Sequence, residues 1–153
     1  MRTIKCFDDL VAFVTSRPEP VYVRWTREDP KRDVRRGRSL NHQTGHYETG
    51  LSVERISPAP DDPAPRAYVV QQLLSYLALG GHPYLLTGEE VGTGSDGEPV
   101  LANPALVALL SPAVIAEART LSWETGEVCR HDGRREVYTT GTYCCQCNSV
   151  IAR

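Results

Sequence analysis

Residues 83–101 of this chain, PYLLTGEEVGTGSDGEPVL, predict two strands joined by a turn. The apolar run over 83–91 has the length and composition of a buried strand. The glycine-rich segment 92–97 favours a turn, and residues 99–101 begin the second strand. A glycine-rich loop after a strand can also bind phosphate, but no helix with a Lys-Ser or Lys-Thr pair follows this one. A hairpin is therefore the better interpretation.

The elements on either side of this hairpin are predicted from the spacing of apolar residues. The pattern indicates helices over 7–16, 68–77, 104–110 and 112–123, strands over 21–25 and 51–56, and a C-terminal hairpin around 132–133. In the first of these strands, Tyr22 and Arg24 are expected on the face opposite to Val21 and Val23. Residues 27–50 carry few apolar side chains and are expected to form a long surface loop.

This order of elements predicts an α+β fold, with a small mixed or antiparallel sheet and two or three helices. We expect a globular domain over 1–123 and a zinc-ribbon-like hairpin over 124–153. The composition, 41% hydrophobic and 24% charged over 153 residues, is typical of a soluble globular protein. A net charge of −2 argues against a protein that coats nucleic acid. Without an apolar run of roughly 18–20 residues or a signal core, the predicted location is the cytoplasm.

Four of the five cysteines lie within the last quarter of the chain and suggest a zinc site. The expected ligands of one structural Zn²⁺ ion are Cys129, His131, Cys144 and Cys147. Two alternatives remain open, because Cys145 could replace Cys144, and His42 or His46 could replace His131. The thiols could also be unliganded. Four protein ligands leave no open position on the metal, so the ion would stabilise the fold and would not be catalytic.

A second group of charged residues lies between residues 27 and 38. Its basic members are Arg27, Lys31, Arg32, Arg35, Arg36 and Arg38. Guanidinium groups bind phosphate oxygens, so this segment could bind nucleic acid or another phosphate. The alternative is that the charges are only solvated, as is common for charged loops.

Arg24 in the first strand, Ser52 in the second and Glu98 after the glycine-rich turn form a dispersed set. Their order resembles the arrangement in ADP-ribosyltransferases. The resemblance implies that the arginine holds a dinucleotide such as NAD, the serine braces the site and the glutamate stabilises the cation-like sugar of the transition state. The alternative for Arg24 is an exposed strand residue in a salt bridge.

The segments 22–27, 50–53 and 86–88, together with Gly94 and 98–100, resemble an uncharacterised family of small actinobacterial proteins. The resemblance covers roughly residues 7–120 and provides no catalytic residues that could be assigned to this chain. The cysteine-rich tail departs from the pattern of the family. The main hypothesis is therefore a zinc-stabilised binding protein whose partner, a protein or a small molecule, is unidentified. An NAD-using enzyme and a nucleic-acid-binding protein are the alternatives.

Overall fold

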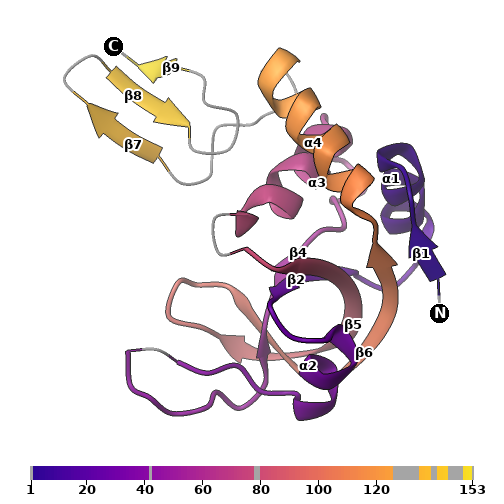
Figure 1. Cartoon of the computed structure of the whole chain (residues 1–153), viewed down its shortest axis with the longest axis vertical. Coiled ribbons are helices and arrows are strands. Elements are labelled where there is room, and N and C mark those ends of the chain that lie inside the picture. Colours follow the sequence, from indigo (N-terminus) through magenta and orange to yellow (C-terminus); the bar gives the residue numbers. More distant parts are fainter. Residues whose placement is uncertain are drawn as a thin grey trace.

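The computed structural model describes residues 2–41, 43–77, 80–125, 135–138, 141–144 and 150–152, with side chains as far as Ser122 (Figure 1). The elements are β1 (Arg2–Ile4), α1 (Phe7–Ser16), β2 (Tyr22–Thr26), α2 (Pro30–Arg36), β3 (Leu51–Ser52), β4 (Glu54–Arg55), α3 (Pro65–Leu74), β5 (His82–Thr93), β6 (Pro99–Leu110), α4 (Pro112–Thr125), β7 (Arg135–Tyr138), β8 (Gly141–Cys144) and β9 (Val150–Ala152). The predicted α+β class is confirmed.

The predicted hairpin over 83–101 forms the centre of the sheet as β5 and β6, which are longer than expected. Three register shifts interrupt the pairing of the two strands, and Figure 1 shows that they curve together. Bulges bend a strand and increase its twist, which explains this curvature. The prediction of a helix over residues 104–110 was wrong, because these residues belong to β6. Pairing with β5 on one side and with β1 on the other outweighs their local helical spacing.

The six-stranded sheet has the order β1-β6-β5-β2-β4, and β3 also pairs with β6. The pairing of β1 with β6 is parallel, and the other pairs are antiparallel. The single strand predicted over 51–56 is divided at Val53, since β3 pairs with β6 while β4 pairs with β2. This change of partner sets Ser52 opposite Val100, two residues after Glu98.

The two faces of the sheet are covered differently. Helices α1, α3 and α4 cover one face and bury the larger core, which includes Leu10, Leu73, Val114, Val23 and Leu85. A smaller cluster on the other face contains Tyr22, Tyr84 and Leu101, with Val34 of α2 packed against it. Tyr22 and Val23 therefore face opposite sides of the sheet, as predicted. Each buried aliphatic or aromatic side chain contributes about 1.5–3 kcal/mol, so most of the hydrophobic stabilisation lies on the helix-covered face.

The prediction of a long loop over residues 27–50 was wrong for much of this range. Asp29 caps α2 by accepting a hydrogen bond from the Lys31 N–H at 3.1 Å, and Gly37 ends the helix with φ 65°. Residues 39–50, apart from the undescribed residue 42, then form a short hairpin, in which the Ser39 N–H donates to Gly50 O at 3.0 Å. A β-carbon at Gly50 would overlap the Leu101 carbonyl oxygen, so a glycine is needed where this hairpin meets β6.

The C-terminal strands β7, β8 and β9 form a separate antiparallel sheet. The described part of the tail therefore has three strands instead of the two predicted, and α4 ends at Thr125, close to its predicted end. The turn predicted at 132–133 lies outside the described residues. So do Cys129, His131, Cys145, Cys147 and the side chain of Cys144. Within the described part of the chain, no helix is long and apolar enough to cross a membrane.

Candidate functional site

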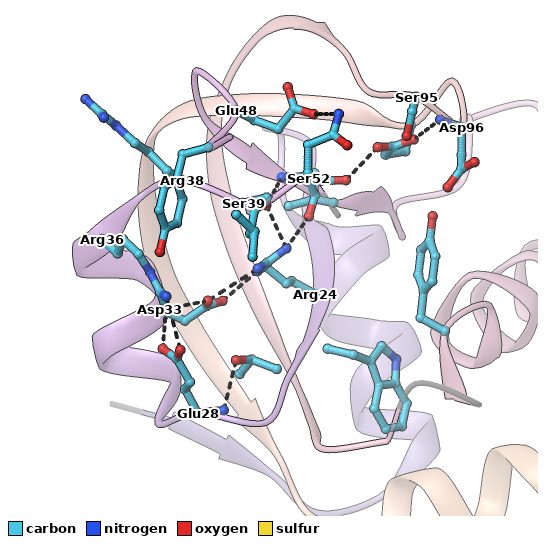
Figure 2. Close-up of a pocket in the computed structure, with 18 of the residues that line it drawn as sticks. Arg24, Glu28, Asp33, Arg36, Arg38, Ser39, Glu48, Ser52, Ser95 and Asp96 are labelled. Atoms are coloured by element: carbon cyan, nitrogen blue, oxygen red, sulfur yellow. Dashed lines mark hydrogen bonds and ion pairs between the residues drawn. The ribbon is translucent and has the colours of Figure 1, made fainter. Parts of the chain in front are cut away.

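A pocket of about 680 Å³ opens on the face of the sheet that carries α2. Its lining residues come from β2 and the residues that follow it, α2, the 39–50 hairpin, β3 with Val53, the segment after α3, and the turn between β5 and β6 (Figure 2). Arg24, Ser52 and Glu98 all line it. The three residues singled out in the sequence therefore belong to one pocket, although they are widely separated along the chain.

An ion pair between Arg24 and Asp33 forms one wall of the pocket. The Arg24 Nε–H donates to Asp33 Oδ2 at 2.6 Å, and Nη2 donates to Oδ1 at 3.3 Å. Only 3% of the Asp33 side chain and 18% of the Arg24 side chain are exposed. The Tyr84 hydroxyl donates to the same carboxylate at 2.7 Å, and burial followed by this bond raises the pKa of Tyr84. The buried charge of Asp33 is thus neutralised by Arg24 and further hydrogen-bonded by Tyr84.

The other end of the Arg24 guanidinium fixes β3 and the base of the 39–50 hairpin. Its Nη1 donates to the Ser52 carbonyl oxygen at 2.8 Å and to Ser39 Oγ at 3.0 Å. Ser39 Oγ in turn accepts from the Ser52 N–H at 2.8 Å. With the two bonds to Asp33, these contacts use four of the five N–H groups of a guanidinium. Arg24 is therefore salt-bridged as the alternative supposed, but it is largely buried and has at most one N–H for a ligand.

Glu98 is held at the pocket by two hydrogen bonds. Its Oε1 accepts from Ser52 Oγ at 2.8 Å and its Oε2 accepts from the Asp96 N–H at 2.9 Å. Only 8% of the residue is exposed. A β-carbon at Gly94 would overlap this carboxylate, so the turn needs glycine for Glu98 to adopt its position. The arrangement fixes the direction of a carboxylate whose charge is only partly neutralised by hydrogen bonds.

An acidic side of the pocket surrounds Glu98. Asp96 and Tyr76 line the pocket beside it, and the Tyr76 hydroxyl donates to Glu54 Oε1 at 3.0 Å. Burial raises the pKa of Glu54; the hydrogen bond from Tyr76 opposes this rise, and the negative charges of Glu98 and Asp96 add to it. Burial and then the charge of Glu54 raise the pKa of Tyr76. This side therefore carries an excess of negative charge and favours a cationic group.

Across Ser52 lies the side of the pocket that we call the basic side for its arginines, although Glu28, Asp33 and Glu48 also line the pocket. Figure 2 shows Arg36 and Arg38 on one side of Ser52, and Ser95 and Asp96 on the other. Arg36 is ion-paired with Glu28 and also approaches Asp33 at 3.5 Å. Arg38 is exposed and lines the pocket, and none of the described carboxylates forms a salt bridge with it.

The rim above the basic side is the 39–50 hairpin, which is stiffened by its own side chains. Asn41 Oδ1 accepts from the Gln43 N–H at 2.9 Å, and Asn41 Nδ2 donates to Glu48 Oε1 at 3.1 Å. Leu40 and Tyr47, which pair across the hairpin, remain 42% and 54% exposed and line the pocket. A fixed rim with exposed apolar surface is suited to packing against a flat ligand.

Comparison with known proteins identifies the family. The sequence pattern of a family described as of unknown function, DUF6098, matches residues 1–132. The chain belongs to the DUF6098 family. No curated protein and no solved structure matches it. The resemblance to an uncharacterised family is thus confirmed over a longer stretch than expected, while an actinobacterial origin stays a prediction. The DUF6098 match itself assigns no activity, so the chemistry must be inferred from the pocket.

The metal hypothesis rests on a part of this DUF6098 protein that the structure does not describe. Among the described residues, no group of three or more His, Cys, Asp or Glu side chains is arranged to hold a metal ion. His46 lies at the end of a turn, with its N–H donating to Thr44 Oγ1 at 3.3 Å, and His42 is outside the described residues. Zinc binding by the tail stays a prediction.

Sequence reasoning missed Asp33, Ser39 and Tyr76, which complete the pocket. Asp33 lies in a charged segment without apolar periodicity, so its helix was overlooked, although Asp29-Pro30 is a recognisable start signal. The basic segment 27–38 is not a free loop, because it forms α2 and supplies Arg27, Arg36 and Arg38 to the pocket.

Proposed function

We propose that the pocket binds NAD⁺ and that Glu98 promotes transfer of its ADP-ribosyl group to a nucleophile. The single observation that carries the proposal is the chain of contacts from Arg24 to Ser52 to Glu98. Arg24 donates to the Ser52 carbonyl at 2.8 Å, and Ser52 Oγ donates to Glu98 at 2.8 Å. A serine that orients a carboxylate, next to a buried arginine, is the arrangement that the resemblance to ADP-ribosyltransferases implies.

The chemistry required of Glu98 is electrostatic. In this reaction the bond between the ribose C1′ and the nicotinamide nitrogen breaks, and its electron pair neutralises the ring nitrogen. The sugar carries positive charge until the nucleophile, water or an acceptor group, forms the new bond to C1′ and releases a proton. A carboxylate already fixed in direction stabilises that charge without reorganising at the moment of reaction. Ser52 and the Asp96 N–H provide this fixed direction.

The charge distribution of the pocket supports a dinucleotide. NAD⁺ has a cationic nicotinamide ring at one end and a pyrophosphate in its middle. The acidic side around Glu98 and Tyr76 suits the ring, and the basic side suits the phosphates. Trp25 and Tyr47 line the same pocket and offer aromatic surface to a base. A volume of about 680 Å³ is within the usual range for small-molecule sites, roughly 300–1,000 Å³.

The test is nicotinamide release from NAD⁺ by the full chain, measured by chromatography, together with NAD⁺ affinity measured by calorimetry. Glu98→Gln keeps an acceptor for Ser52 but removes the charge. We expect this variant to bind NAD⁺ and to release nicotinamide at least about 100-fold more slowly. Glu89→Gln is the matched control, since Glu89 is exposed on β5 and does not line the pocket.

Two outcomes would contradict the proposal. The first is that the wild-type chain does not bind NAD⁺ at millimolar concentration. The second is that Glu98→Gln and Glu89→Gln release nicotinamide at the wild-type rate. The first result would return the pocket to the broader hypothesis of a binding protein, and the second would remove Glu98 from the catalytic role.

A further inference from the structure

We propose that Arg38, and not Arg24, is the arginine that binds the phosphates of the ligand. This inference rests on the proposed function, since it assigns one subsite of the same pocket. It also changes the role that the resemblance implies for Arg24, which becomes a positioning residue for β3 and Glu98.

Arg24 has little hydrogen-bonding capacity left to offer a ligand. Its guanidinium is bound by Asp33 through Nε and Nη2 and donates to Ser39 and Ser52 through Nη1. Recruiting Arg24 to a phosphate would require breaking the ion pair with Asp33. That would remove the main partner of Asp33, which is 2% exposed and would keep only the Tyr84 hydroxyl and the longer contact with Arg36 at 3.5 Å.

Arg36 is also engaged, although its ion pair with Glu28 is exposed and the one between Arg24 and Asp33 is largely buried. Arg36 is paired with Glu28 through both of its terminal nitrogens, and hydrogen bonding to Glu28 raises the pKa of Arg36. Arg27, a further lining residue, packs along Gly80 and makes contacts within the protein. These arginines are already engaged, whereas Arg38 lines the pocket without a salt bridge to any described carboxylate.

The backbone around Arg38 is fixed, while the Arg38 side chain is exposed. Gly37 before it ends α2, with its N–H donating to Asp33 O at 3.1 Å. Ser39 after it is tied to Gly50, Arg24 and Ser52. An anchored backbone reduces the entropy lost when the guanidinium binds phosphate. The fork of a guanidinium also matches phosphate oxygens in geometry.

The experiment compares ligands with and without phosphate. Calorimetry on the full chain measures the Kd of ADP, NAD⁺ and nicotinamide riboside, which lacks phosphate. Arg38→Ala should weaken ADP and NAD⁺ by about tenfold to hundredfold and leave nicotinamide riboside within about twofold. Arg38→Lys should recover part of the loss, because lysine keeps the charge without the fork. Arg35→Ala is the control, since it removes the same charge from an exposed α2 position that does not line the pocket.

The outcomes separate this inference from the proposed function. If Arg38→Ala binds ADP as the wild type does, or weakens all three ligands equally, Arg38 is not the phosphate-binding residue. The same conclusion follows if the wild-type chain binds neither ADP nor NAD⁺. If the wild type binds ADP through Arg38 but releases no nicotinamide from NAD⁺, the phosphate subsite stands and the proposed transferase function fails.

Discussion

Ser52 and Glu98 are 46 residues apart and are joined by a hydrogen bond of 2.8 Å from Ser52 Oγ to Glu98 Oε1. The two elements that carry them meet because β3 pairs with the start of β6, where Leu51 and Ser52 lie opposite Leu101 and Val100. The serine is also fixed from behind by Arg24 and Ser39. The direction of the Glu98 carboxylate therefore depends on the register of the sheet as well as on its own turn.

Removing the Ser52 hydroxyl tests this dependence. In Ser52→Ala we expect nicotinamide release to fall about tenfold to hundredfold, because a carboxylate misplaced by about 1 Å can lose that much activity. The free energy of unfolding, from urea titration, should fall by only about 0.5–1.5 kcal/mol, the worth of one hydrogen bond. Ser16→Ala, at the exposed end of α1 and outside the pocket, should leave both quantities unchanged. Equal effects of the two substitutions would contradict the role of Ser52.

A methyl group at Gly94 should have a larger effect on activity than on stability. It would occupy the position of the Glu98 carboxylate and push it out of reach of Ser52. We expect Gly94→Ala to reduce nicotinamide release as strongly as Glu98→Gln. Gly92→Ala is the control, since a β-carbon there meets nothing within 4 Å. Wild-type turnover in Gly94→Ala would argue against the catalytic position of Glu98.

The Arg24 and Asp33 pair should behave as one unit in unfolding experiments. Either Arg24→Met or Asp33→Leu leaves the partner's charge buried and should cost about 3–5 kcal/mol of the free energy of unfolding. The double variant should be clearly more stable than the sum of the single changes predicts. Urea titration of the four proteins measures the coupling. Additive losses would mean that the pair, with Nε to Oδ2 at 2.6 Å, contributes no coupling energy.

The raised pKa of Glu54 predicts a pH dependence of stability. Because burial raises it above the ordinary value of 4.5, the folded protein keeps a proton that the unfolded chain releases. This contribution is complete below the unfolded pKa and is lost as the pH rises through the folded pKa. We expect Glu54→Gln, which has no proton to release, to become more stable than wild type as the pH rises from 4 to 8. Urea titrations of both proteins at each pH measure the difference.

Zinc binding by the tail is an independent proposal that rests on the cysteine pattern. Elemental analysis of protein purified without chelator should find one zinc ion per chain, and a chelator should lower the melting temperature. Cys129→Ser, Cys144→Ser and Cys147→Ser should each lose the metal, as should His131→Asn. Cys6→Ser is the control, since Cys6 lies next to α1, far along the chain from the tail. Metal-free wild-type protein would rule the site out.

The parts of the fold that were predicted correctly follow local patterns. The spacing of Phe7, Leu10 and Val14 predicted α1 with its observed bounds, because one apolar face of this helix packs on the core. Tyr22 and Val23 point to opposite faces of the sheet because side chains alternate with a two-residue period along a strand. The errors arose where local pattern and tertiary pairing differ. Residues 104–110 form part of β6 although they have helical spacing, and α2 has little apolar periodicity although it is a helix.

The sequence by itself determined the α+β class, the central hairpin and the identity of Arg24, Ser52 and Glu98 as residues of interest. Only the tertiary structure decided that these side chains share a pocket. Arg24 is hydrogen-bonded to Asp33, 9 residues away in the sequence, and to Ser52, 28 residues away. Ser52 is hydrogen-bonded to Glu98, 46 residues away in the sequence. The pairing of β2 with β5 and of β3 with β6 brings these segments of the chain together. The register of such long-range pairs depends on how both faces of the sheet pack, which no local pattern records.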